Sequence, residues 1–144
     1  MGHKVHPKIH RTPVTYVWDS RWFSKKNYGT YAVEDLAIRE YLMNKCKSAN
    51  VDSISIERSA KNMIITILAA KPGFIIGRSG MGLDEIRKYI ETRFLKMAMK
   101  VKLNVRELRS PALSAAVVGQ TIAAETEKRI PFRRCMKQAI ENVM

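Results

Sequence analysis

Apolar residues recur along this chain with a period that changes from helical to extended. From Val33 to about Ser48 they recur every three to four residues, which is typical of a helix with one apolar face. Residues 53–57 then alternate between apolar and polar as a half-buried strand does, and residues 63–69 form a second predicted strand after a short turn at residues 59–61. The second strand is apolar on both faces, which predicts a central place in a sheet.

After this hairpin the pattern becomes helical again. We expect a short helical segment from Pro72 to Ile76, a break at the sequence Gly-Arg-Ser-Gly of residues 77–80, and a longer helix from about Gly82 to Met97. Residues 101–106 alternate cleanly and predict a third strand.

Two further helices are predicted at the carboxyl end. Ser110-Pro111 is a favourable helix start, because serine caps the first amides and proline fits the first helical position. Ile130-Pro131 ends that helix and begins another. We therefore expect an α+β chain in three parts: an N-terminal arm over residues 1–30, a domain over 31–109 with a three-stranded sheet backed by helices, and a C-terminal helical pair over 110–144.

Positive charge changes this picture. The chain has a formal net charge of +13 and a pI near 10.0, which makes nucleic acid the first candidate partner. Residues 31–70 are neutral, whereas the arm, residues 71–109 and residues 129–140 are rich in Lys and Arg. These three basic segments are candidate RNA surfaces. We expect no membrane partner, because the apolar runs are too short to span a bilayer.

The break at residues 77–80 carries the most specific chemistry. Two glycines between helices allow backbone to approach a phosphate, Arg78 adds charge, and the helix N-terminus that follows favours an anion. Ile75 and Ile76 offer apolar surface on which unstacked bases could lie. A P-loop is excluded by spacing, since three residues rather than four separate Gly73 and Gly77 and no lysine follows.

The stretch from residue 75 to 83, Ile-Ile-Gly-Arg-Ser-Gly-Met-Gly-Leu, resembles the Ile-Ile-Gly-x-x-Gly-x-x-Leu signature of KH domains. Two strands precede it and one follows, as in the type II arrangement. The resemblance implies a KH type II fold that clamps single-stranded RNA. The residues implied to touch RNA in this turn are Ile75, Ile76, Gly77, Arg78, Ser79 and Gly80.

The two ends of the chain resemble bacterial-type small-subunit ribosomal protein three. The opening Met-Gly-His-Lys-Val-His-Pro, the Trp18–Phe23 stretch and the run Phe-Arg-Arg-Cys-Met-Lys at residues 132–137 carry this resemblance. It implies a structural, non-enzymatic protein of the cytoplasmic ribosome that contacts rRNA in the subunit head, neighbouring ribosomal proteins and incoming mRNA. His3 stands where that family usually has glutamine, and family members continue into a second α/β domain after this region, so that the chain is either a short form or a fragment.

The resemblance also assigns roles to two cation groups. Arm residues are expected to bind rRNA, and these are Lys4, His6, Lys8 and Arg11. On the last helix Arg133, Arg134 and Lys137 share one narrow sector at about 100° per residue. By pattern alone this sector is an ordinary solvated face, with Phe132, Met136, Ala139, Ile140 and Val143 packing on the domain. The family implies instead that the three cations meet mRNA and help to open paired mRNA.

Other candidate sites are weaker. Cys46 and Cys135 form no ligand motif and are read as reduced, half-buried thiols. The arm histidines lack further metal ligands, so we expect no metal. The sequence also has no nucleophile–base pair and no cofactor loop, so we expect no cofactor and no small-molecule substrate. Trp18, Trp22 and Phe23 either stack on bases or anchor the arm. A free KH module that acts as an RNA chaperone or assembly factor is the alternative function.

Overall fold

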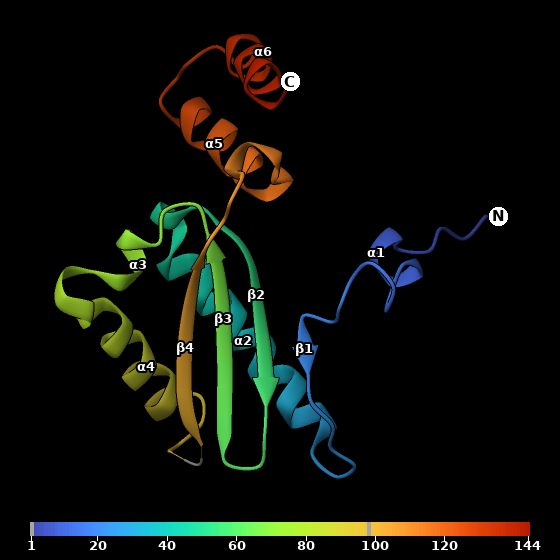
Figure 1. Cartoon of the computed structure of the whole chain (residues 1–144), viewed down its shortest axis with the longest axis vertical. Coiled ribbons are helices and arrows are strands. Elements are labelled where there is room, and N and C mark those ends of the chain that lie inside the picture. The colour runs from blue at the N-terminus through green and yellow to red at the C-terminus, as the bar shows by residue number, and fades with distance from the viewer. Residues whose placement is uncertain (1, 98) are drawn as a thin grey trace.

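The computed structural model describes residues 2–97 and 99–144 (Figure 1). Its helices and strands follow the predicted order. They are α1 (Pro7–His10), β1 (Ser20–Arg21), α2 (Tyr28–Lys45), β2 (Val51–Arg58), β3 (Asn62–Ala69), α3 (Gly73–Ile76), α4 (Met81–Arg93), β4 (Lys100–Glu107), α5 (Ala115–Glu127) and α6 (Phe132–Val143), with 3-10 turns at Lys47–Ala49, Arg78–Gly80 and Pro111–Leu113.

The sheet has the order β1-β2-β3-β4. Strands β2 and β3 form an antiparallel hairpin, and β4 returns parallel to β3, with Ile65 opposite Leu103. The α+β fold with three main strands and two C-terminal helices is therefore confirmed. The sheet nevertheless has one strand more than predicted, because Ser20–Arg21 pairs in parallel with β2. Backbone hydrogen bonds such as Ile56 N–H to Asp19 O, at 2.8 Å, hold this edge without any apolar alternation in the arm.

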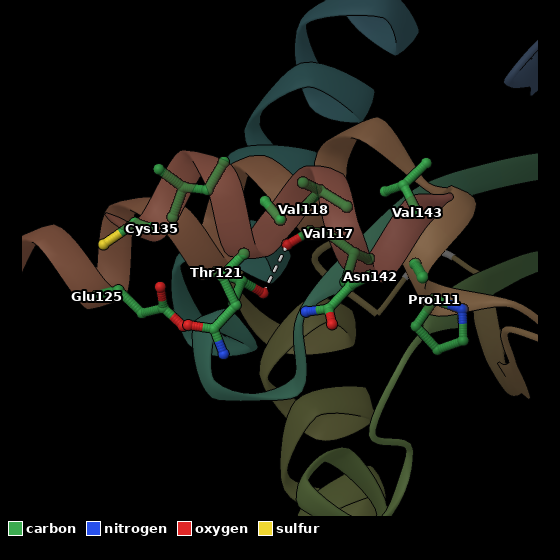
Figure 2. Close-up of a pocket in the computed structure, with 12 residues that line it drawn as sticks. Pro111, Val117, Val118, Thr121, Glu125, Cys135, Asn142 and Val143 are labelled. Carbon is green, nitrogen blue, oxygen red and sulfur yellow. Dashed lines mark hydrogen bonds between the residues drawn. The ribbon is translucent and has the colours of Figure 1, made fainter. Parts of the chain in front are cut away.

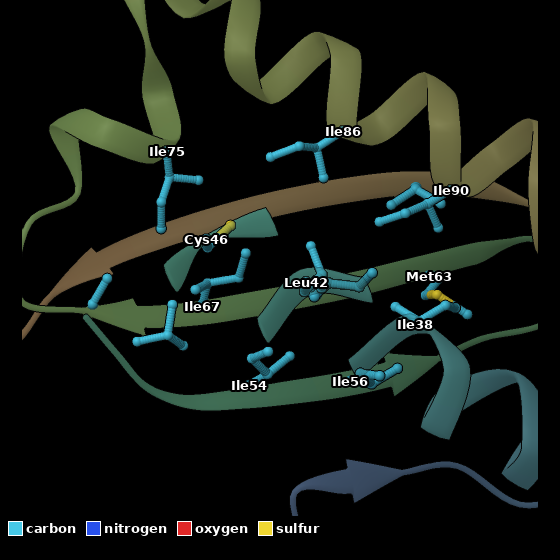
Figure 3. Packing of buried hydrophobic residues seen from close by; sticks show 14 of the residues in the cluster. Ile38, Leu42, Cys46, Ile54, Ile56, Met63, Ile67, Ile75, Ile86 and Ile90 are labelled. Atoms are coloured by element: carbon cyan, nitrogen blue, oxygen red, sulfur yellow. The ribbon is translucent and has the colours of Figure 1, made fainter. Parts of the chain in front are cut away.

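Helices α2, α3 and α4 place their apolar side chains on one face of the sheet. Ile38 and Leu42 of α2 and Ile90 of α4 are fully buried against Ile65 and Ile67 of β3. Figure 3 shows Ile38, Leu42 and Ile90 of the helices and Ile67 of β3 pointing into one continuous layer between helices and strands. Strand β3 lies between β2 and β4, which confirms its predicted central position, and its buried residues alternate because the helices cover one face of the sheet.

Two helices differ from the prediction at their ends. Helix α2 begins at Tyr28, five residues before the first periodic apolar residue, because its first turn packs its aromatic rings on the arm rather than on the core. Helix α4 ends at Arg93, where the chain reverses towards β4 with Lys96 and Met97 at positive φ. Met97 is therefore 72% exposed instead of continuing the apolar stripe.

The C-terminal helices form a hairpin that stands on the end of the sheet (Figure 1). Ser110 does not cap the long helix, because residues 111–113 form a separate 3-10 turn and the Ser114 side chain accepts the Val117 N–H instead. Gln120 Nε2 donates to Val51 O at 2.9 Å and ties α5 to the start of β2. Among the residues that the structure describes, no helix is long and apolar enough to cross a membrane.

Candidate nucleic-acid interface

The turn between α3 and α4 is built from backbone conformations that favour glycine. Gly77 has φ +69° and ψ −175°, and Gly80 has φ +80° and ψ 2°. Ser79 between them also has a positive φ of 55°. Residues with side chains enter these regions at a cost, so the two glycines let the chain reverse tightly between the helices. We call residues 77–80 the GRSG turn.

A third glycine closes the turn from the other side. A Cβ on Gly82 would lie 2.6 Å from the Ile75 carbonyl oxygen, which is closer than atoms can approach. The first turn of α4 thus rests directly on the end of α3, and only glycine permits this contact. The sequence reading placed Gly82 at a helix start and missed this role; the spacing of Gly77, Gly80 and Gly82 was the available signal.

The side chains around the turn divide into an inner and an outer set. Ile75 is only 2% exposed and belongs to the core, so its side chain does not offer the exposed apolar surface that the sequence indicated. Its neighbours Phe74, Ile76 and Met81 are 68%, 37% and 64% exposed. Phe74 was missed because periodicity within the one-turn helix α3 does not show which residue faces the sheet, and Met81 was missed because it is the first residue of α4, ahead of that helix's apolar stripe.

The outer surface of the turn suits an anion. Arg78 and Ser79 are exposed, and the GRSG turn leads directly into the N-terminus of α4, a helix of 13 residues. The helix dipole places partial positive charge at that end, next to the Arg78 guanidinium. Exposed apolar side chains lie alongside in sequence. The arrangement can hold a phosphate on the turn while neighbouring bases lie on apolar surface.

Sequence comparison agrees with this geometry. The sequence model of the family described as KH domain matches residues 37–113, which is more than half of the chain. The chain belongs to the KH domain family. The match covers the GRSG turn, the three main strands, helices α3 and α4, and the second half of α2.

Similarity also extends beyond the KH domain. Proteins named small ribosomal subunit protein uS3 match 100% of this chain, at 44% identity in Methylibium petroleiphilum and 41% in Caldicellulosiruptor bescii. A third, from Roseobacter denitrificans, is 44% identical. The resemblance to bacterial-type small-subunit ribosomal protein three is thereby confirmed. The chain spans 48%, 64% and 60% of the lengths of these three relatives.

The basic arm extends away from the KH domain, far from the GRSG turn (Figure 1). All four arm residues predicted to bind RNA are exposed. His6 has a local task as well, because its Nδ1 accepts the Lys8 N–H at 3.2 Å and caps α1. Trp18 and Phe23 are exposed, at 59% and 83%. Trp22 is half-buried and joins the arm to α2, so only Trp22 of the three aromatic residues is seen to anchor the arm. We call Lys4, Lys8 and Arg11 the arm cations.

On α6 the structure gathers Arg133, Arg134 and Lys137 around one open surface hollow of about 690 Å³. We call them the α6 cations. Glu141 and Asn142 also line this hollow, so the group contains one carboxylate as well as three positive charges. The α6 cations are exposed and stand at the opposite end of the molecule from the β2–β3 turn (Figure 1).

The apolar side of α6 packs differently from the prediction. Cys135 is 1% exposed and faces α5, whereas Phe132, Met136 and Ile140 are more than half exposed. A cavity of about 150 Å³ lies between α5, α6 and Pro111, as Figure 2 shows. These side chains stay exposed because α5 covers only one stripe of α6, and the apolar face of α6 is wider than that stripe.

Neither thiol is half-buried as predicted, because Cys46 is 4% and Cys135 1% exposed. Both cysteines are free. Burial raises the pKa of the Cys46 thiol, and burial together with Glu125 raises the pKa of the Cys135 thiol. Both therefore stay protonated and unreactive near neutral pH. Within the described part of the chain, no group of three His, Cys, Asp or Glu residues is arranged to hold a metal ion.

Proposed function

We propose that this chain is an RNA-binding structural protein of the small ribosomal subunit and works in the cytoplasm as part of the ribosome. The observation that carries the proposal is a KH domain with an exposed GRSG turn inside a chain that matches proteins of that subunit over its whole length. A protein of this kind acts by binding and positioning RNA and needs no reaction of its own.

The GRSG turn binds single-stranded RNA backbone in this proposal. A phosphate lies against the turn, where the α4 N-terminus and Arg78 both attract it. Unstacked bases lie on the exposed apolar side chains of Phe74, Ile76 and Met81, which are close to the turn in sequence. Ile75 contributes from below by anchoring α3 to the sheet.

The arm cations bind rRNA in the head of the subunit. They are exposed on a segment whose hydrogen bonds, such as Arg11 Nη1–H to Pro7 O and Thr15 N–H to Arg11 O, stay within the arm. Such a segment can follow the path of an RNA groove without disturbing the domain behind it. Neighbouring ribosomal proteins are the remaining partners on this side.

The α6 cations contact mRNA at the channel through which it enters the ribosome. Their shared hollow is wide and open, which suits a moving phosphate backbone better than a small molecule. The α6 cations bind one mRNA strand while the ribosome moves along the message. Paired mRNA is then opened by the ribosome's movement and needs no nucleotide site on this chain.

Sedimentation tests the central proposal. An epitope-tagged chain expressed in a bacterium should migrate with small subunits on a sucrose gradient and stay there after a moderate salt wash. The matched control is the same chain with the α6 cations changed to Gln, which should still enter the subunit because those residues serve mRNA. A tagged chain found only in the free pool would favour the alternative of a separate KH module.

A further inference from the structure

A buried ion pair lies where the arm joins the KH domain. Asp35 of α2 is 3% exposed, and the side chain of Arg58 at the end of β2 is 2% exposed. Arg58 Nε donates to Asp35 Oδ1 at 2.7 Å, and its Nη1 donates to Glu34 Oε2 at 2.7 Å. The guanidinium also lies over the Tyr31 ring, 4.8 Å from its centre. This side of the pair connects two elements of the domain.

The second oxygen of Asp35 serves the arm. Oδ2 accepts the Trp22 Nε1–H at 2.7 Å and the Ser20 hydroxyl at 3.0 Å. Ser20 in turn accepts a hydrogen bond from Arg39 Nη2 at 2.6 Å. One carboxylate therefore divides its two oxygens between the domain and the arm. We call Asp35, Ser20, Trp22 and Arg39 the arm latch.

Fold stability alone is a weak reason for this arrangement. A buried ion pair loses hydration and often contributes little net stability, whereas its directional bonds specify one geometry among several. Here the specified geometry is the start of the arm, because β1 pairs with β2 over only two residues. The Trp22 ring adds contacts with Tyr28 and Tyr31, at centroid distances of 5.1 and 5.6 Å.

We propose that Asp35 is a positioning residue for RNA binding: through Ser20 and Trp22 it fixes the point and direction at which the basic arm leaves the KH domain. The proposal rests on the RNA-binding role of the arm cations proposed above. With the latch closed, the arm cations are tethered at residues 20–22. With it open, only the two-residue β1–β2 pairing and the exposed Arg21–Glu57 ion pair hold the arm before α2, which begins at Tyr28.

The expected size follows from the tether. Effective concentration falls roughly as the −3/2 power of tether length, so moving the anchor from residue 20 to 28 lowers RNA affinity about two-fold, and the freed segment adds an ordering cost. Two paired residues are too few to hold this edge alone, so opening the latch should weaken binding by about two-fold. The loss of RNA affinity should disappear when the arm cations are neutralised. A neutral arm does not bind RNA in this proposal, so the place where it leaves the domain then has no effect on affinity.

A double-mutant cycle in the full chain tests this dependence. The latch variant combines Ser20→Ala with Trp22→Phe, which removes both donors to Asp35 Oδ2 but leaves the Asp35–Arg58 pair and an aromatic ring in place. The arm-neutral variant changes Lys4, Lys8 and Arg11 to Gln. Affinity of all four chains is measured by fluorescence anisotropy with a labelled polyuridylate long enough to reach from the GRSG turn to the arm, and thermal melting monitors folding. If the combined latch variant does not fold, Trp22→Phe alone is used.

The four chains separate the two proposals. A latch effect that is present with the charged arm and absent with the neutral arm supports the positioning role. An equal loss of RNA affinity with the charged and the neutral arm overturns the positioning role, since the latch would then act only on the fold. The positioning role is also overturned if the latch variant binds RNA like wild type while the arm-neutral chain binds weakly. If neutralising the arm leaves affinity unchanged, the proposed RNA role of the arm itself fails, and the positioning role fails with it.

Discussion

Replacing Gly80 by Asp and by Asn separates charge from shape at the GRSG turn. The two side chains have nearly the same size, and a Cβ at Gly80 meets no atom within 4 Å. Gly80 has φ +80°, a left-handed conformation that Asn and Asp tolerate better than other residues with side chains. Gly80 also stands at the N-cap of α4, where Asn and Asp are about equally favourable. Both variants should therefore fold with similar stability.

The two variants should differ in RNA affinity. If a phosphate lies roughly 5 Å from the new carboxylate, repulsion between the charges is about 1–3 kcal/mol for effective dielectric constants between those of water and a protein surface. That corresponds to a loss in affinity of about five-fold to about 150-fold for Gly80→Asp. Gly80→Asn carries no charge, and its Cβ meets no atom within 4 Å, so it should bind within about two-fold of wild type.

The assay is fluorescence anisotropy with a labelled polyuridylate, together with thermal melting of all three proteins. The difference in RNA affinity between the Gly80→Asp and Gly80→Asn variants should become smaller as salt is added, because salt screens exposed charges. Equal and weak binding by both variants would refute the electrostatic clamp and point to backbone shape alone. Wild-type binding by both would show that RNA does not approach this turn.

Four further predictions address other parts of the chain. Changing the arm cations to Gln should flatten the slope of log affinity against log salt by about 2 units, since each lost phosphate contact removes about 0.7–0.9, and should leave melting unchanged; a large drop in melting temperature would make the arm part of the core. Changing the α6 cations to Ala should slow elongation of reconstituted ribosomes through mRNA hairpins but not on unstructured messages, and equal rates for mutant and wild type on both would refute the mRNA role. Ile67→Ala should cost about 2–5 kcal/mol of unfolding free energy in urea, because Ile67 is fully buried, whereas half-buried Ile64→Ala on the opposite face of β3 should cost less. Because burial raises the pKa of both thiols, Cys46 and Cys135 should resist alkylation of the folded chain at about pH 8, where a free thiol is partly ionised; rapid labelling seen by mass spectrometry without unfolding would contradict this.

The sequence by itself determined the features that depend on short-range spacing. Alternation of apolar and polar residues located β2 and β4, because successive side chains of a strand point to opposite faces, and a run that is apolar on both faces located β3. The glycine spacing located the turn at residues 77–80, since a reversal between two helices requires positive φ whatever the rest of the chain does. These features reside in neighbouring residues and can be read from them.

Only the tertiary structure decided which residues meet across long sequence separations. Asp35 and Arg58 are 23 positions apart, and nothing near either residue indicates that they share a buried site with Trp22. Burial likewise assigned Ile75 to the core and exposed Phe74, although both lie in one short apolar run. The physical reason is the same in each case: a side chain's partners are set by the packing of whole elements, and local periodicity fixes an element's type but not its neighbours.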